Sequence, residues 1–380
     1  GKLSKYQPAR VIGAGTAGTG KSRTTRAIVA QRRLRVRKAG LTGEAVRGCC
    51  ALAAPTGCAS FQIKFGASTA HRVFGIPCRR AFKRINKNST QYAGLRKRLL
   101  LSRLLVLDER SMIGRRFLGK VAFRLNEVLG RGEGPKEATL GFRDLLMMGD
   151  DKQIDPIGDH GLYTDVAMKS DANAVEGGPT QNALVGLGLS VRNECEDVVI
   201  LRDVHRRDDG KDIADVEERQ RYCEEANEFV RVCRKLADCD LTRAEHAWLS
   251  KRNKSELLKT KEGRQEYAKF SDAILLTDIR QRNVEGRDGA DQLNARELRR
   301  VARENGVPIA SWGALHSEDE KGADPKFLDP EAFGGLAATR ELCEGARVLL
   351  TDNLWVQAGL VNGALGVVKG FVWPEGGSPG

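Results

Sequence analysis

The sequence lacks the features that define several classes of protein. No apolar run approaches the roughly 18 residues of a membrane-spanning helix, so we expect a protein that is not integral to a bilayer. No signal peptide is recognisable, and because the chain begins with Gly1 rather than Met, we expect a clipped start. These absences predict an intracellular protein, in the nucleus or mitochondrion of a eukaryote or in the cytoplasm of a bacterium.

Cysteine pairs of the C-x-x-C type are also missing. The nine cysteines are odd in number and scattered along the chain, which argues against a zinc site or a disulfide framework. We therefore expect reduced thiols, as in intracellular proteins.

Acidic residues are scarce in the first third of the chain. Residues 1–130 contain 28 lysines and arginines against four acids, a net charge of +24, whereas the whole chain carries +13. The remaining residues therefore carry −11. This asymmetry predicts a polyanionic partner such as nucleic acid for the first half. The alternative is a bias towards arginine that only covers the surface.

The sequence contains a complete phosphate-binding loop of the form G-x-x-x-x-G-K-S at residues 15–22. An apolar run at residues 11–12 precedes it and a helical pattern at residues 26–30 follows it, which is the context that the motif needs. Glycine N–H groups can surround a polyphosphate, and the helix N-terminus adds positive potential. The alternative is a chance glycine-rich turn. The expected nucleotide-binding residues are Gly15, Gly18, Thr19, Gly20, Lys21 and Ser22, with Ser22 also on Mg²⁺.

Two later apolar segments end in polar residues suited to nucleotide hydrolysis. Residues 104–107 are followed by Asp108 and Glu109. In a phosphate-loop ATPase such an aspartate holds Mg²⁺, and the adjacent glutamate can deprotonate the attacking water. Residues 145–148 lead to Gln153, and a glutamine in this place can contact the γ-phosphate or the attacking water.

Polar groups also follow the apolar segment at residues 49–54. A turn at residues 55–57 comes directly after it, and open α/β sheets place ligand contacts at the carboxyl ends of their strands. Ser68 and Thr69 precede His71 a little further on. A lone histidine is more often structural, but this setting suits contacts with phosphate groups.

The rest of the chain gives a coarser prediction. Residues 169–193 are rich in Gly, Asn, Ser and Asp, which predicts a loop or insertion. Residues 198–201 predict a strand. Residues 211–257 are highly charged with apolar residues at helical spacing, which predicts a pair of helices packed on the core. Residues 273–276 and 347–350 predict strands of a second sheet.

The order of these motifs resembles that of the Pif-type (petite integration frequency) helicases, which are RecD-like members of superfamily one. The resemblance runs from about residue 10 to about residue 372 and involves several independent motifs in the same order. The matching segments are residues 17–22, 54–59, 66–71, 74–77, 108–112, 149–153, 204–206, 353–355 and 359–366.

The resemblance implies roles for particular residues in a motor that uses ATP and Mg²⁺ on single-stranded DNA. It implies that Asp108 and Ser22 hold the metal and that Arg206 is an arginine finger. The catalytic residues that it implies are Lys21, Glu109, Gln153 and Arg206. The DNA contacts that it implies are Pro55, Thr56, Gly57, Ser68, Thr69 and His71 in the first domain, and Asn362 and Gly363 in the second.

The sequence departs from the family pattern at several positions. Arg110 stands where the family usually has an apolar residue, Asp155 where a proline is common, and Arg207 where a glutamine usually follows the finger. The chain stops at Gly380, before the Thr-x-His-x-x-Gln-Gly and Ala-x-Ser-Arg motifs and the second arginine finger. No glutamine that could read adenine is identifiable before the phosphate loop. We therefore expect a fragment that binds nucleotide but unwinds DNA weakly or not at all.

The sequence thus predicts an α/β protein of the P-loop NTPase class with two RecA-like parallel-sheet domains. Residues 1–209 form the first domain, and residues 210–380 form the second, which is incomplete and carries the charged helical segment. The function that the resemblance implies is ATP hydrolysis coupled to 5′-to-3′ translocation on single-stranded DNA and unwinding of forked or structured duplexes, in DNA repair, recombination or telomere maintenance. Three alternatives stay open: the helicase portion of a rolling-circle (Helitron-type) transposon protein, a nucleic-acid-binding fragment without catalysis, and an unrelated phosphate-loop ATPase or kinase.

Overall fold

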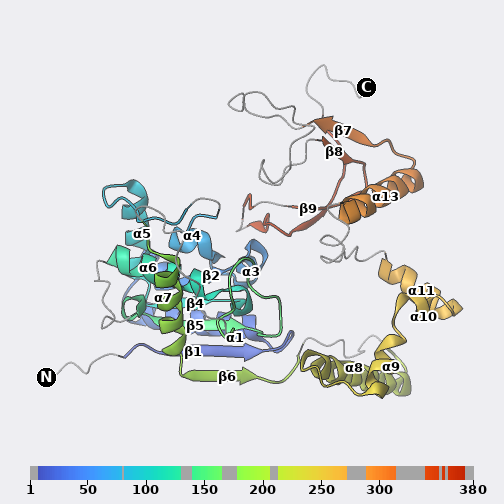
Figure 1. Ribbon diagram of the computed structural model, residues 1–380, viewed down its shortest axis with the longest axis horizontal. Coiled ribbons are helices and arrows are strands. Elements are labelled where there is room, and N and C mark those ends of the chain that lie inside the picture. Colours follow the sequence, from blue (N-terminus) through green and yellow to red (C-terminus); the bar gives the residue numbers. More distant parts are fainter. Residues whose placement is uncertain are drawn as a thin grey trace. The chain divides into compact units, whose positions relative to one another are not determined.

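The first half of the chain is built on a six-stranded parallel sheet. A computed structural model describes residues 7–78, 81–129, 139–164, 178–205, 213–271, 288–313, 339–350, 353–355 and 358–372. The strand order across the sheet is β3-β2-β4-β5-β1-β6, and all neighbouring strands run parallel (Figure 1). The strands are β1 (Arg10–Gly15), β2 (Cys50–Ala54), β3 (Ser68–Thr69), β4 (Leu104–Leu107), β5 (Asp144–Gly149) and β6 (Asp197–Leu201).

Helices accompany these strands as expected for an α/β protein. Two short 3₁₀ turns complete this part of the chain: η1 (Arg110–Met112) follows β4, and η2 (Thr139–Phe142) precedes β5. The α/β fold class is thereby confirmed. The helices are α1 (Lys21–Lys38), α2 (Gly43–Gly48), α3 (Gly57–Ile63), α4 (Ala70–Phe74), α5 (Thr90–Leu101), α6 (Arg115–Leu129), α7 (Gln181–Asn193) and α8 (Val216–Ala237).

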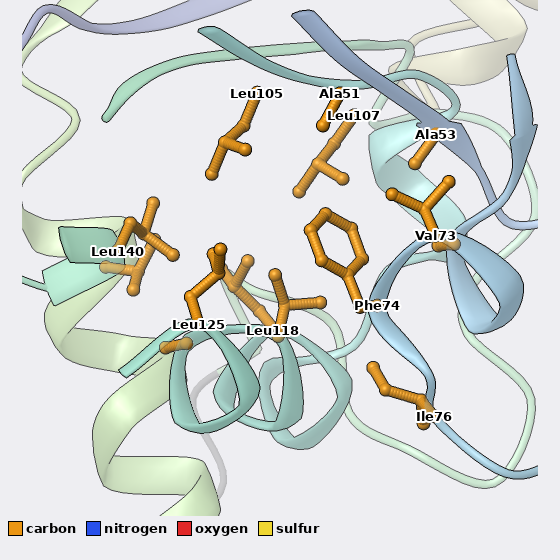
Figure 2. Packing of buried hydrophobic residues seen from close by; sticks show 14 of the residues in the cluster. Ala51, Ala53, Val73, Phe74, Ile76, Leu105, Leu107, Leu118, Leu125 and Leu140 are labelled. Carbon is orange, nitrogen blue, oxygen red and sulfur yellow. The ribbon is translucent and has the colours of Figure 1, made fainter. Parts of the chain in front are cut away.

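The strands β2, β4 and β5 are apolar and buried at almost every position because both faces of this central part of the sheet are covered, whereas the edge strand β6 is mostly exposed. In β4, Leu105 and Leu107 belong to a cluster that includes residues of α4, α5, α6 and α7. Leu104 and Val106, on the opposite face, pack in a cluster with residues of α1 and α3. Figure 2 shows the first cluster, in which Phe74 lies between the strand residues and α6. This covering leaves the carboxyl ends of the strands as the place for polar loops.

Helix α7 corrects one prediction. The segment 169–193 was expected to be a loop, but residues 181–193 form a helix that packs on α6 and buries Leu184, Gly188 and Val191. Thr180 caps the helix, because its side chain accepts a hydrogen bond from the N–H of Ala183 at 3.1 Å. Small residues in α7 are therefore not a sign of a loop: they allow the two helices to approach closely.

The close approach of α6 and α7 gives a stability prediction with a built-in control. A Cβ on Gly188 would lie 1.8 Å from the carbonyl oxygen of Arg115, whereas a Cβ on Gly186 in the same helix would meet nothing within 4 Å. We expect Gly188→Ala to destabilise the fold by about 1–3 kcal/mol, as overpacking does. Gly186→Ala should instead stabilise it by up to about 1 kcal/mol, since alanine favours helix. Urea unfolding measures both, and equal effects would contradict the packing described here.

The chain divides into two compact units. The first comprises Gly1–Cys239 and Thr351–Gly363, and the second comprises Asp240–Leu350 and Ala364–Gly380. The expected domain boundary between residues 209 and 210 remains a prediction. In the second unit, Ala302 of helix α13 (Asp288–Asn305) packs with Cys343 and Ala346 in a small separate cluster. Its elements are α9 (Arg243–Ser250), α10 (Lys254–Leu257), α11 (Lys261–Ser271), α13 (Asp288–Asn305), β7 (Ala310–Gly313), β8 (Thr339–Leu342), β9 (Arg347–Leu349) and β10 (Leu365–Val367).

Two expectations for the later part of the chain change. Residues 211–257 contain the three helices α8, α9 and α10 rather than a pair, and most of α8 is exposed, with Val232 as its buried residue. The strands described in the second unit pair antiparallel, β7 with β8 and β9 with β10. The expected strand at residues 273–276 lies outside the described residues, so a second parallel sheet stays a prediction. Among the helices of the described ranges, none is long and apolar enough to cross a membrane.

Candidate nucleotide and DNA site

The phosphate-binding loop has the local geometry that its sequence predicts. It connects β1 to α1, and Gly18 and Gly20 have φ angles of 83° and 89°, which residues with a side chain rarely adopt. The Lys21 ammonium donates hydrogen bonds to the carbonyl oxygens of Gly15 at 2.7 Å and Thr16 at 3.1 Å. Thr19 Oγ1 also donates to Thr16 at 2.8 Å. The loop thus holds its lysine close to the segment where a phosphate would bind.

The strand order places the other predicted motifs beside this loop. Strand β5, which neighbours β1, ends just before Gln153, and β4, the next strand, ends just before Asp108 and Glu109. Strand β2 follows and leads to the turn at residues 55–57, and β3 carries Ser68 and Thr69 at the same edge. Because the strands are parallel, all these segments leave the sheet at its carboxyl edge. The predicted residues therefore follow one another along this edge.

Asp108 is buried and unusually basic for a carboxyl group. It is 3% exposed, and burial raises its pKa to about 6, with the charge of Glu109 adding to the shift. A hydrogen bond from the N–H of Glu109 at 3.0 Å acts in the opposite direction, as does the positive charge of Lys21. Burial destabilises the negative charge of Asp108, and a cation bound beside the carboxylate would compensate that charge.

The residues present fit a magnesium ion. The part of the chain that the structure describes contains no group of three or more His, Cys, Asp or Glu residues that could hold a metal. Mg²⁺ does not need such a group, because it typically takes one or two carboxylates together with water and substrate phosphates. The Asp108 carboxylate and the Ser22 hydroxyl at the start of α1 provide oxygen ligands of the required kind.

The raised pKa of Asp108 gives a pH prediction. Below about pH 6 the carboxyl is increasingly protonated and cannot bind Mg²⁺, so at about pH 5 only about one tenth of it is ionised. We expect the Mg²⁺ concentration for half-maximal nucleotide binding to rise about tenfold between pH 7 and pH 5. Titrations of Mg²⁺ with a fluorescent ATP analogue measure this, and a constant value across this range would contradict it.

Glu109 has a strained backbone that sequence patterns do not reveal. Its φ and ψ are 51° and 54°, the left-handed region, and it directly precedes the 3₁₀ turn η1 without a capping hydrogen bond from its side chain. Non-glycine residues in this region cost of the order of 1–3 kcal/mol and occur at functional sites when the surroundings enforce them. The half-buried Glu109 is therefore held in a defined place next to Asp108.

Gln153 is held by a neighbouring aspartate. Its Nε2 donates to the Asp150 carboxylate at 3.2 Å, and its N–H donates to the Asp150 carbonyl at 3.1 Å. The N–H of Lys152 also donates to the Asp150 carboxylate, at 3.2 Å. The role of Gln153 as a sensor stays a prediction.

The segment that follows β6 also contacts the phosphate loop. The N–H of His205 donates to the carbonyl oxygen of Gly18 at 2.8 Å. Nothing in the sequence indicates this contact, because it joins the loops after β1 and β6, which are neighbours in the sheet but far apart along the chain. Arg206, the predicted arginine finger, lies outside the described residues, so its role stays a prediction.

The turn at residues 55–57 starts helix α3 and is covered by a later segment. Thr56 caps the helix, since its Oγ1 accepts a hydrogen bond from the N–H of Ala59 at 3.2 Å. Pro55 is half-buried before it. Gly57 is buried so closely that a Cβ would lie 1.9 Å from Oδ1 of Asn353. A side chain at position 57 would therefore displace the later segment.

The described residues of this later segment, 353–355 and 358–363, bring the predicted DNA contacts of both halves together. The thiol of Cys58 donates to the carbonyl oxygen of Asn362 at 3.0 Å, and the N–H of Asn362 donates to Oδ1 of Asn353 at 3.0 Å. A Cβ on Gly363 would lie 2.9 Å from Sγ of Cys58. Asn362 and Gly363 thus lie next to the turn at residues 55–57, as a shared DNA surface requires. Their contact with DNA stays a prediction.

His71 lies in a partly apolar setting. It belongs to α4, which begins after Thr69, and its ring centroid is 4.8 Å from that of Phe117. Burial lowers its pKa, and the charge of Lys120 lowers it further. A neutral imidazole can still donate one hydrogen bond to a phosphate oxygen. The oxygen of the Ser68 hydroxyl is buried and has no hydrogen-bond partner among the residues that the structure describes.

Comparison with protein families gives one match. The PIF1-like helicase family matches residues 3–174, which contain the phosphate loop, the two acids and Gln153. No curated protein sequence matches the chain.

Solved structures of Pif1 helicases share the fold. A Pif1 structure described as explaining DNA unwinding at forked duplexes is 19% identical, with a TM-score of 0.54, over 96% of this chain and 68% of that one. Pif1 from Candida albicans is 17% identical with a TM-score of 0.53, over 97% and 66%. Bacteroides Pif1 bound to single-stranded DNA is 19% identical with a TM-score of 0.51, over 96% and 66%. The chain spans about two thirds of the length of these relatives.

Proposed function

We propose that this chain is the motor portion of an ATP-dependent DNA helicase, which couples ATP hydrolysis to movement along single-stranded DNA and to duplex unwinding. The observation that carries the proposal is the order in which the predicted motifs follow one another along the carboxyl edge of the sheet. The phosphate loop, Gln153, the two acids and the turn at residues 55–57 follow β1, β5, β4 and β2, which are consecutive neighbours. Nucleotide and DNA contacts therefore share a single rigid scaffold.

The residues have complementary roles in the proposed hydrolysis. Lys21 and the N–H groups of the loop bind the ATP phosphates, and Ser22 and Asp108 hold Mg²⁺, which neutralises the charge on the β- and γ-phosphates. Glu109 takes a proton from the attacking water, and Gln153 contacts the γ-phosphate or that water. Arg206 stabilises the charge that develops on the transferred group.

The proposed DNA surface is suited to binding without reading sequence. The hydroxyls of Thr56, Ser68 and Thr69 and the amides near Asn362 are groups that grip phosphates. The excess of lysines and arginines over acids in residues 1–130 supports a positive surface that follows a single strand. The solved Pif1 structures with DNA support this part of the proposal. Movement in the 5′-to-3′ direction and a role in repair, recombination or telomere maintenance are further parts of it.

A binding experiment tests the DNA part of this proposal. Fluorescence anisotropy of a labelled oligo-dT should show binding whose affinity falls linearly with salt on a double logarithmic plot, because phosphate contacts release counterions. Gly57→Val should weaken this binding, since its side chain would collide with Asn353. Gly94→Val, whose added Cβ meets nothing within 4 Å on α5, is the matched control. Absence of binding to single strands at low salt would contradict the proposal.

A further inference from the structure

The residue after the two acids is buried and forms an ion pair with a partly exposed aspartate in the loop that carries Gln153. Arg110 begins the turn η1 and is 1% exposed. Its Nε donates to the Asp151 carboxylate at 3.0 Å, and its Nη2 pairs with the second oxygen of the same carboxylate. This two-pronged geometry fixes both the distance and the orientation of the two groups.

The surroundings of the Arg110 guanidinium hold it in this orientation. It lies 5.7 Å from the ring centroid of Tyr163, and the guanidinium of Arg192 in α7 lies 4.8 Å from the same ring. A Cβ on Gly149 would lie 2.6 Å from the backbone nitrogen of Arg110, so the end of β5 and the turn η1 are in direct contact. The side chain has little freedom to move independently of either segment.

The ion pair therefore joins the two segments that carry the chemistry. On one side of it, Glu109 precedes Arg110 and keeps a left-handed backbone that its surroundings must enforce. On the other side, Asp151 lies between Asp150 and Gln153, and Asp150 is the group that holds Gln153. Neither Arg110 nor Asp151 needs to touch ATP for this arrangement to matter.

We propose that Arg110 and Asp151 are a positioning pair, which fixes the water-activating Glu109 and the sensor Gln153 relative to each other. The inference rests on the proposed function, since it assigns these two residues to the hydrolysis step. It also explains why a charged residue can occupy the buried position 110. The pair replaces apolar packing with a directional link between the loops after β4 and β5.

The pair should affect the turnover rate rather than ATP binding. Loss of a positioning contact displaces catalytic groups by a fraction of an ångström to about 1 Å, and such displacements cost up to about 100-fold in rate. We expect Arg110→Met and Asp151→Asn each to lower kcat for DNA-stimulated ATP hydrolysis by about 10- to 100-fold. KM for ATP should change less than about threefold, because the phosphate loop is untouched.

Two comparisons separate positioning from general stability. Arg124 is also 1% exposed, pairs with a carboxylate (Glu127) and lies over an aromatic ring, but it is far from the catalytic edge in α6. Arg124→Met should lower the melting temperature and leave kcat unchanged at temperatures below unfolding. The double variant Arg110→Met/Asp151→Asn should have the same kcat as either single variant, because both remove one interaction.

The experiment is steady-state ATP hydrolysis by the 380-residue chain with and without oligo-dT. Asp151 is 47% exposed, so Asp151→Asn is expected to fold even if Arg110→Met does not. If the unaltered chain hydrolyses ATP and both variants match it in kcat, the positioning pair is refuted. Multiplicative losses in the double variant, or an equal loss of kcat in Arg124→Met, would also refute it. If the unaltered chain shows no hydrolysis, the proposed function itself fails.

Discussion

Lys21→Ala is expected to abolish ATP hydrolysis, with kcat/KM falling at least about 100- to 1,000-fold. The ammonium of Lys21 is the single positive side chain that the phosphate loop itself supplies, and the loop holds it over the Gly15 and Thr16 carbonyls. Without it, the negative charge of the ATP phosphates and of the transition state is left uncompensated on this side. Because Lys21 also lies near Asp108, its loss should raise the pKa of that carboxyl further.

The control for this variant lies on the same helix. Lys38 is exposed in the last turn of α1, about 25 Å along the axis from Lys21 at 1.5 Å per residue. Lys38→Ala should keep wild-type affinity for a fluorescent ATP analogue. Measurable hydrolysis by Lys21→Ala at a tenth of the wild-type rate or more would show that the phosphate loop is not the catalytic nucleotide site.

Glu109→Gln is expected to separate binding from hydrolysis. Removal of a general base lowers the rate by about 10²- to 10⁴-fold, while the amide keeps the size of the side chain. Since Glu109 is not a phosphate ligand in the proposed mechanism, affinity for ATP should stay within a few-fold of the wild type. A variant that binds ATP and releases almost no phosphate is therefore the expected result, measured by analogue fluorescence and by phosphate release.

The matched control for Glu109 is an acid outside the site. Glu44 is exposed and its carboxylate pairs with Lys97 at 3.2 Å on the surface. Exposed pairs of this kind contribute little to stability, so Glu44→Gln should hydrolyse ATP normally. If Glu109→Gln instead loses ATP affinity and keeps its turnover at saturating ATP, Glu109 acts in binding and another residue must activate the water.

The first half of the fold could be predicted because its apolar runs and its glycines occur where the packing of the sheet and the turn of the phosphate loop require them. Runs such as residues 104–107 are apolar at every position, and a strand covered on both faces needs that. The phosphate loop has glycines at the two positions where φ is positive. The acids and Gln153 were placed near it because parallel strands end at one edge.

The features that could not be predicted depend on contacts between distant segments. Helix α7 contains glycines that pattern rules assign to loops, but Gly188 is required by the approach of α6. The hydrogen bond between His205 and Gly18 and the ion pair between Arg110 and Asp151 join residues whose pairing no local signal specifies. Arg110 itself was visible in the sequence only as a departure from an apolar position.

The second half was predicted less well because its signals are weaker. Its charged helices have few buried residues, and burial is what fixes the number and ends of helices. The motif at residues 353–355 and 359–366, by contrast, is recognisable in the sequence, and its residues Asn353, Asn362 and Gly363 lie against the start of α3, next to the turn at residues 55–57. In this half, the sequence therefore predicted structure best at residues such as Gly363, where the backbone approaches another segment closely.

The most direct test of the account is the rate of ATP hydrolysis by this chain with and without single-stranded oligo-dT. The account predicts a rate that rises several-fold on addition of DNA and disappears in Lys21→Ala, because the proposed nucleotide and DNA contacts follow strands that end at one edge of the sheet. Equal rates with and without DNA, in a chain shown to bind both ligands, would contradict the coupling on which the proposed motor depends.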